Sequence, residues 1–268
     1  MPRSSPLDVH AIQTHLTTQY LGRRIALHEH LDSTNRTAVA LAQAGAEHGT
    51  LVMADAQTAG RGRMARQWFS PSGINLYGSL IVRTKISAER TTEWLSWLPL
   101  MTALGAAEAI EIVGSARIAV KWPNDLLINE RKVGGILCES GTFAGSGPFQ
   151  VIGIGINVNG ARNDFPEELR DIATTIREET GSLIDRNRLV GQLLHELECC
   201  LDEFLARGSE RIAPAYRRRC ATLGKTVKAI LADGKECLGV AEAIEQDGSL
   251  TLRQRSQEGT EAPAVRHH

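Results

Sequence analysis

Four short apolar runs that follow one another with only turns between them constrain the fold of this chain more than any other feature. They cover residues 118–122, 125–128, 132–138 and 149–156. Each run has the length of a strand, and the gaps between them are too short for regular helical crossovers. Strands in succession favour a mixed or antiparallel sheet, so we expect an α+β fold rather than a doubly wound parallel sheet.

The other expected elements come from capping residues and apolar periodicity. In chain order they are a weak helix over residues 7–20, a helix over 36–44, strands over 50–56 and 76–83, a helix that starts at Pro99, and a long helix between Asp185 and Gly208. Pro99 is expected in the first turn of its helix, where an N–H would have no partner anyway. Asp185 is expected to cap the long helix and Gly208 to end it.

The last part of the chain has a different texture, with short β-like runs separated by Asp-Gly pairs. Asp233-Gly234 and Asp247-Gly248 are the strongest short-range signals for β-hairpins. We therefore divide the chain into a larger domain over residues 1–222 and a small C-terminal β-barrel over residues 223–268.

Composition excludes several classes of protein. The 268 residues are 42% hydrophobic with a net charge of −1, which excludes a disordered chain and a global positive field for nucleic acid or anionic membranes. No apolar run reaches the roughly 18 residues of a membrane span, and residues 1–8 lack the apolar core of a signal peptide. The cysteines, 5 in number, show no C-x-x-C spacing, which predicts reduced thiols in a cytoplasmic protein.

The stretch Gly60-Arg61-Gly62-Arg63, followed by Trp68, carries the most chemical information. Glycines let backbone amides approach a ligand, and the two guanidinium groups can form bidentate hydrogen bonds with a carboxylate or a phosphate. Because the stretch lies between two expected strands, it is suited to act as a flap that orders over an anion. A solvated basic turn is the alternative for this motif taken alone.

Two further motifs place single polar groups at the ends of expected strands. The K-W-P-N-D run at residues 121–125 is an ordinary hairpin turn when taken alone, but Asp125 beside a phosphate-binding loop suits Mg²⁺. Lys132 opens a strand that contains Gly134 and Gly135, where its charge would stabilise negative charge in a transition state. The alternative is a lysine that extends along a strand edge into water.

Two polar sets suit a planar base and an uncharged ligand head. Alternating glycines at 153 and 155 give a strand one flat face, and Asn157 after them has the amide that reads an adenine edge, although a β-bulge is equally compatible. Asp32-Ser33-Thr34-Asn35, together with Gln57, supplies neutral donors and acceptors. Taken alone, the Ser-Thr-Asn triplet is a helix cap.

In this order and spacing, the five motifs resemble those of biotin protein ligases (biotin–[acetyl-CoA-carboxylase] ligases). The resemblance covers about residues 25–255 and rests above all on G-R-G-R-x-x-R-x-W together with K-W-P-N-D. It implies a class II synthetase-like fold with a mixed or antiparallel central sheet and flanking helices, followed by an SH3-like β-barrel. It also implies an ATP-dependent ligase that forms biotinyl-5′-AMP and transfers biotin to a lysine of a biotin carboxyl carrier protein.

By this resemblance each motif takes a role. Biotin would contact Ser33, Thr34, Asn35, Gln57, Arg61, Gly62, Arg63, Lys132 and Gly134, with Ser33, Thr34 and Gln57 at its ureido ring. ATP or the adenylate would contact Arg61, Arg63, Trp68, Asn124, Asp125, Lys132 and Asn157, and Asp125 would also meet Mg²⁺. Lys132 and Arg63 are the expected catalytic residues. Biotin, ATP and Mg²⁺ are substrates and activator, and no permanently bound cofactor is expected.

The two ends of the chain depart from parts of the family. Only 32 residues precede Ser33, too few for the winged helix-turn-helix of members that repress genes, so we expect neither DNA binding nor a repressor. The chain ends in EAPAVRHH instead of a Gly-Glu-(Ile/Val)-Ser-like strand, so the last strand is expected to be short or differently paired. The resemblance also implies a homodimer formed by edge-strand pairing of the central sheets.

Two alternative functions remain at this point. A lipoate or octanoate transferase shares the architecture, but its Arg-Ser-Gly-Gly-Gly loop is absent and a lipoyl ring would not need the hydrogen-bonding set at Ser33 and Gln57. A biotin-sensing DNA-binding regulator is the second alternative.

Overall fold

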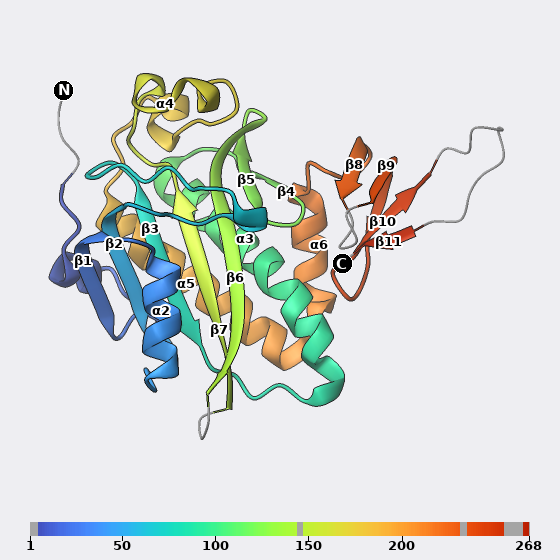
Figure 1. Ribbon diagram of the computed structural model, residues 1–268, viewed down its shortest axis with the longest axis horizontal. Coiled ribbons are helices and arrows are strands. Elements are labelled where there is room, and N and C mark those ends of the chain that lie inside the picture. The colour runs from blue at the N-terminus through green and yellow to red at the C-terminus, as the bar shows by residue number, and fades with distance from the viewer. Residues whose placement is uncertain (1–4, 144–146, 231–234, 255–264, 268) are drawn as a thin grey trace.

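The computed structural model describes residues 5–143, 147–230, 235–254 and 265–267, which form two β-sheets with flanking helices (Figure 1). The strands are β1 (Ile25–Leu31), β2 (Leu51–Gln57), β3 (Leu76–Val82), β4 (Ala119–Lys121), β5 (Asp125–Ile128), β6 (Arg131–Phe143), β7 (Gly147–Ile156), β8 (Thr226–Ile230), β9 (Glu236–Ile244), β10 (Leu250–Arg253) and β11 (Val265–His267). The helices are α1 (Val9–Thr14), α2 (Thr34–Gln43), α3 (Thr91–Gly114), α4 (Ile176–Thr180), α5 (Arg186–Arg207) and α6 (Ser209–Arg219), with 3₁₀ turns η1 (Arg63–Ala65), η2 (Ala88–Arg90), η3 (Arg162–Asp164) and η4 (Glu167–Leu169).

The seven-stranded sheet has the order β1-β2-β3-β7-β6-β5-β4. β1 and β2 are parallel, and the other neighbouring pairs are antiparallel. The apolar runs separated by short turns therefore correctly predicted a mixed or antiparallel sheet, and the α+β class is confirmed.

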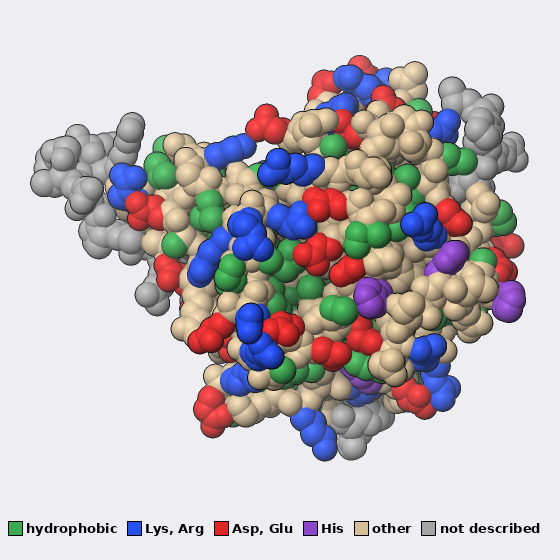
Figure 2. Space-filling view, turned by 180° about the vertical axis from the view of Figure 1, so that it is seen from behind, with side chains coloured by type: hydrophobic (Ala, Val, Ile, Leu, Met, Phe, Trp, Pro, Cys, Tyr) green, Lys and Arg blue, Asp and Glu red, His purple; other side chains and the backbone are tan. Residues whose placement is uncertain are grey.

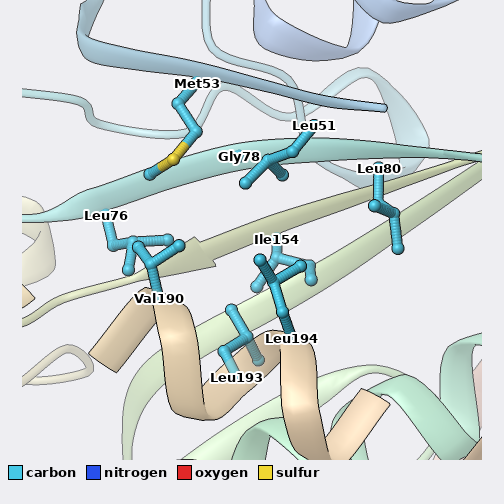
Figure 3. Close-up of a pocket in the computed structure, with 9 residues that line it drawn as sticks. All are labelled: Leu51, Met53, Leu76, Gly78, Leu80, Ile154, Val190, Leu193 and Leu194. Carbon is cyan, nitrogen blue, oxygen red and sulfur yellow. The ribbon is translucent and has the colours of Figure 1, made fainter. Parts of the chain in front are cut away.

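Helices cover both faces of this sheet (Figure 1). On one face, Ala38 of α2 joins Ile81 and Val151 in an apolar cluster. On the other face, α5 places Leu193 and Leu194 against the strands around a small cavity of about 10 Å³ (Figure 3). Because both faces are covered, β3 is buried along its whole length.

The position of Pro99 differs from the prediction. Helix α3 begins at Thr91, so the proline lies inside the helix rather than in its first turn. The preceding turns bury Trp94 and Trp97, which are 1% and 0% exposed, and this burial offsets the cost of an interior proline. The helix over Ala88–Gly114 is also apolar and long enough to cross a membrane by length and composition, but 72% of its apolar window is buried, as in the core helix of a soluble protein.

Other helix boundaries divide into confirmed and missed cases. Asp185 caps α5 by accepting hydrogen bonds from the N–H groups of Asn187 and Arg188, and Gly208 ends the helix, as predicted. The helix expected over residues 7–20 is shorter, since α1 ends at Thr14. Helix α6 was not predicted, because it follows Gly208 without an intervening loop.

The C-terminal segment forms an antiparallel sheet in the order β11-β10-β9-β8, consistent with an SH3-like domain. The hairpin at Asp247-Gly248 is confirmed, with Gly248 at φ 84°, whereas Asp233-Gly234 lies outside the described residues. The last strand is short, as expected. Trp97 of α3 and Trp122, which follows β4, donate indole hydrogen bonds to the carbonyls of Gln246 and Gly248 in the turn between β9 and β10. The division at residue 223 stays a prediction.

Acidic and basic side chains are interspersed over the rear face of the molecule (Figure 2), in line with the near-zero net charge.

Candidate active site

The arginine-bearing loop connects β2 with β3 and extends across the sheet toward β6 (Figure 1). Gly62 N–H donates to the Arg66 carbonyl at 2.8 Å, and Arg61 pairs with Gln67, so the loop forms a narrow ribbon. At its tip Met64 and Ala65 both have positive φ, 55° and 58°. Non-glycine residues in this region are strained, which makes this tip a candidate moving part.

Trp68 lies on the flat face that the alternating glycines provide. A Cβ atom at Gly155 would come within 2.6 Å of the Trp68 ring, and one at Gly135 within 3.2 Å. The ring nitrogen of Trp68 is buried and has no hydrogen-bond partner among the described residues. The glycine strand β7 pairs in unbroken register with β3 and β6, so the β-bulge alternative is wrong.

Lys132 points into the same place instead of extending into water. Its ammonium lies 2.6 Å from Asp125 Oδ1 and 5.3 Å from the centre of the Trp68 ring. The backbone of Lys132 is fixed by hydrogen bonds with Ile172 and Thr174. Three motifs that are far apart in the sequence therefore meet around one lysine.

The 121–125 segment is both a hairpin and part of this site. β4 pairs with β5 as the hairpin interpretation required, and the Trp122–Pro123 peptide is cis. Asn124 donates from Nδ2 to the Ile136 carbonyl at 2.7 Å and accepts from Arg63 at 3.2 Å. Asn124 thereby joins the tip of the arginine loop to β6.

The residues predicted for the ureido ring form a hydrogen-bonded group at the start of α2. Gln57 Oε1 accepts from the backbone N–H of Thr34 at 2.8 Å and from its hydroxyl at 3.2 Å, and Gln57 Nε2 donates to Ser70 at 2.9 Å. Helix α2 begins at Thr34 rather than at residue 36. Ser33 occupies the N-cap position and is 1% exposed, but its side chain makes no capping bond.

Asn157 and Gly134 are surrounded by protein. The Asn157 side chain is 4% exposed and donates to the Thr174 carbonyl at 3.0 Å and the Lys132 carbonyl at 3.5 Å. A Cβ atom at Gly134 would come within 2.9 Å of Leu126, on the face opposite Trp68.

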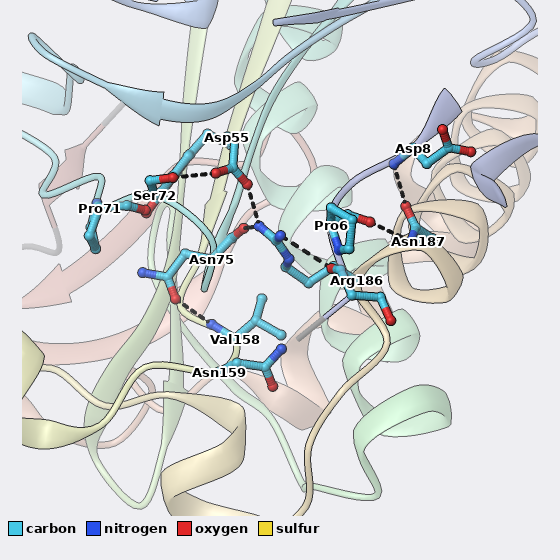
Figure 4. Close-up of polar contacts among 12 residues, drawn as sticks. Pro6, Asp8, Asp55, Pro71, Ser72, Asn75, Val158, Asn159, Arg186 and Asn187 are labelled. Carbon is cyan, nitrogen blue, oxygen red and sulfur yellow. Dashed lines mark hydrogen bonds and ion pairs between the residues drawn. The ribbon is translucent and has the colours of Figure 1, made fainter. Parts of the chain in front are cut away.

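Two charged residues near the loop were missed from the sequence. Glu139 lies on β6 and pairs with Arg61 at 2.9 Å. Arg186, which is 1% exposed, donates to Asp55 Oδ1 at 2.8 Å and to the Asn75 carbonyl at 3.0 Å (Figure 4). A carboxylate within an apolar strand was the only sequence signal for Glu139.

Asp55 ties this arginine to the end of the loop, because its second oxygen accepts from the hydroxyl of Ser72 (Figure 4). Burial acts to raise the pKa of Asp55, but hydrogen bonds from Ser72 and Arg186 and the charge of Arg186 outweigh it and lower the pKa below its usual value.

A half-open cavity of about 310 Å³ adjoins the site. Its walls include Leu95 and Pro99 of α3, Trp122, Ile136 and Gly248, and Arg63 lies at its edge. Cys138 also lines it, but burial raises the pKa of this thiol to about 12, with Arg63 acting in the opposite direction. The thiol is neutral at pH 7 and unsuited as a nucleophile.

The described residues of the site offer few side chains that could bind a metal ion. No group of three or more His, Cys, Asp or Glu side chains within residues 5–143, 147–230, 235–254 and 265–267 could bind one. Asp125 is a single carboxylate already paired with Lys132. This arrangement fits a Mg²⁺ held mainly by nucleotide phosphates and water.

Comparisons with known proteins agree with this geometry. Residues 27–159 match the biotin/lipoate A/B protein ligase family. The chain is 38% identical to the bifunctional ligase/repressor BirA of Bacillus subtilis over 88% of its own length and 71% of that protein. It belongs to the biotin protein ligase family.

Further relatives support this assignment. The ligase is 32% identical to the biotin–[acetyl-CoA-carboxylase] ligase of Mycobacterium tuberculosis, over 92% of this chain and 90% of that one. Its structure is similar to the Aquifex aeolicus biotin protein ligase solved in complex with biotin and ATP, with a TM-score of 0.73, 29% identity and coverage of 91% and 99% of the two chains.

Proposed function

We propose that this ligase joins the carboxylate of biotin to the α-phosphate of ATP, releases pyrophosphate, and transfers the biotinyl group to a lysine of a carrier protein. The convergence on Lys132 carries this proposal, because its ammonium lies beside Asp125 and the Trp68 ring, next to the arginine loop. Two anions that must react repel each other, and a fixed cation between them removes that barrier.

Biotin is expected at the start of α2. The ureido oxygen accepts hydrogen bonds and its two N–H groups donate, so it needs partners of both kinds. Ser33, Thr34 and Gln57 would supply them, and the hydrogen bonds from Thr34 to Gln57, which hold these two side chains side by side, support this assignment. Asn35 orients this end of the helix by its hydrogen bond to Glu139.

The arginine loop and Lys132 serve adenylation. Arg61, Gly62 and Arg63 would close over the valeryl carboxylate and the phosphate, and Trp68 forms the floor beneath them. The chemistry consists of positioning and charge stabilisation, with no nucleophilic side chain. Mg²⁺ would arrive with ATP, with Asp125 and Asn124 near its phosphates.

Asn157 is the residue proposed to bind adenine, and only one atom of its side chain is available for this contact. Its Nδ2 donates to two backbone carbonyls, so its Oδ1 is the atom available to the adenine amino group. The ring nitrogen of Trp68, which has no hydrogen-bond partner among residues that the structure describes, is an additional donor at this site.

The 310 Å³ cavity is suited to the acceptor lysine. Apolar walls favour the neutral amine, which is the nucleophile. The amine nitrogen would attack the acyl carbon, the bond to AMP would break, and AMP would leave while the nitrogen loses a proton to solvent. The biotin carboxyl carrier protein is the proposed source of this lysine.

A homodimer is a separate proposal. β5 pairs with β6 only over Arg131–Gly135, so the remaining edge of β6 has no strand partner among the described residues. Such an edge can pair with a second copy of the chain. Light scattering after gel filtration, with and without biotin plus ATP, measures the assembly.

Pyrophosphate exchange into ATP, run separately with biotin, lipoate and octanoate, tests the substrate. Exchange driven by biotin alone is expected, and exchange driven by lipoate but not biotin would overturn the assignment. A gel-shift assay with operator-like DNA at stated salt, with biotin and ATP present, tests the regulator alternative; we expect no sequence-specific shift.

A further inference from the structure

Glu139 lies between the arginine loop and the start of α2. One of its oxygens is 2.9 Å from Arg61 Nη1, and the other accepts from Arg61 Nη1 at 3.1 Å and from Asn35 Nδ2 at 2.8 Å. This carboxylate therefore occupies the same guanidinium that the proposed function gives to the biotin carboxylate.

The contact continues through the ureido-ring residues. Ser79 Oγ lies 2.6 Å from Asn35 Oδ1 and 2.8 Å from Thr34 Oγ1, and Thr34 is bonded to Gln57. Gln57 in turn reaches Ser70, near the other end of the arginine loop. A continuous polar chain thus connects both ends of the loop through the group that would hold biotin.

The glycine strand makes this route possible. A Cβ atom at Gly153 would lie 2.0 Å from Asn35 Oδ1, so any side chain there would displace Asn35. With glycine at this position, Asn35 lies flat on the sheet and reaches Glu139 on the neighbouring strand. Gly153 therefore leaves the space that the hydrogen bond between Asn35 and Glu139 requires.

We propose that Glu139 is a positioning residue that holds Arg61 while the site is empty and releases it to the carboxylate of biotin. Both oxygens of Glu139 contact Nη1 of Arg61, so a second carboxylate that binds this nitrogen competes with Glu139 for it. The side chains of Arg61 and Glu139 are 44% and 25% exposed, and partly exposed ion pairs are weak enough for a ligand to replace. After release, Glu139 keeps its hydrogen bond from Asn35. This inference rests on the proposed role of Arg61.

The variant Glu139→Gln tests the idea, because it removes the charge while an amide oxygen still accepts from Asn35. Limited trypsin digestion of the empty enzyme, followed by mass spectrometry, measures cleavage after Arg61, Arg63 and Arg66. Loss of a partly exposed ion pair should raise this cleavage about two- to fivefold. The KM for biotin in pyrophosphate exchange should fall by a similar factor of about two to five, because the competing carboxylate is gone. The kcat should stay within about twofold.

Glu47→Gln is the matched control, since Glu47 forms an Arg–Glu pair at 2.8 Å with Arg24 and both side chains are more than 60% exposed. It should leave both measurements at the parent level. Glu139→Asp keeps the charge and should restore parent-like protection from trypsin; circular dichroism confirms that each variant is folded.

A Glu139→Gln variant with unchanged cleavage, or with a raised KM for biotin, overturns the inference. The proposed function has a separate test, because it fails if the parent enzyme shows no biotin-driven pyrophosphate exchange. Trypsin cleavage of the empty enzyme does not depend on this activity.

Discussion

The buried ion pair between Arg186 and Asp55 gives a sharp prediction for the free energy of unfolding. Arg186 is 1% exposed, and Asp55, whose side chain is 25% exposed, is its only carboxylate partner within the described residues (Figure 4). Asp55→Asn keeps a neutral acceptor but leaves the guanidinium charge uncompensated. Breaking a buried pair in this way costs about 3–5 kcal/mol, and because water reaches Asp55 we expect about 3 kcal/mol at pH 7. That is roughly a 150-fold change in the unfolding equilibrium.

Urea unfolding at constant temperature measures this loss as a lower midpoint with an unchanged slope. The matched control is Asp171→Asn, because Asp171 pairs with Arg162 but its side chain is 86% exposed. The control should cost less than about 1 kcal/mol. A loss below about 1 kcal/mol for Asp55→Asn would refute the reasoning.

The same pair gives a pH dependence with a fixed sign. The pKa of Asp55 is lowered in the folded state, so its stabilisation is complete above the unfolded-state pKa and is lost as the pH falls through the folded-state pKa. The gap in unfolding free energy between the parent and Asp55→Asn should therefore narrow from pH 7 toward pH 3. A gap that widens over this range contradicts the assigned cause.

Three further predictions concern the reaction and the core. Lys132→Ala should lower the rate of adenylate formation by about 10²–10³-fold with the fold intact, because it removes a transition-state charge, and near-parent pyrophosphate exchange would contradict this. Arg63→Gly should let the adenylate escape, because the arginine loop loses its hydrogen bond to Asn124. The amount of free biotinyl-5′-AMP measured by chromatography should rise, and release at the parent level would refute the role of the loop as a flap. Gly78→Ala should raise the unfolding free energy by about 1 kcal/mol, because its Cβ would meet Leu51 and Met53 at ordinary distances of 3.5 and 3.8 Å beside the small cavity in Figure 3. A lower urea midpoint for Gly78→Ala would show that the strand cannot accept the methyl group.

The candidate site was predictable as a set of motifs but not as a set of contacts. The loop at residues 60–63 and the lysine at 132 each had a credible structural alternative when taken alone, and only their combination pointed to a ligase. The sequence did not indicate that Asn157 donates to Thr174, or that Glu139 meets Arg61, because these partners are fixed by strand register and by the path of the loop.

What the sequence determined by itself is the part that short-range physics controls. Asp185 and Gly208 set the ends of α5, and Asp247-Gly248 set a hairpin, because capping and turn geometry depend on residues a few positions apart. The tertiary structure alone decided that Pro99 lies inside a helix and that Asp55 neutralises Arg186, 131 positions away. Such outcomes depend on which surfaces are buried together, and burial is a property of the folded chain rather than of any local stretch.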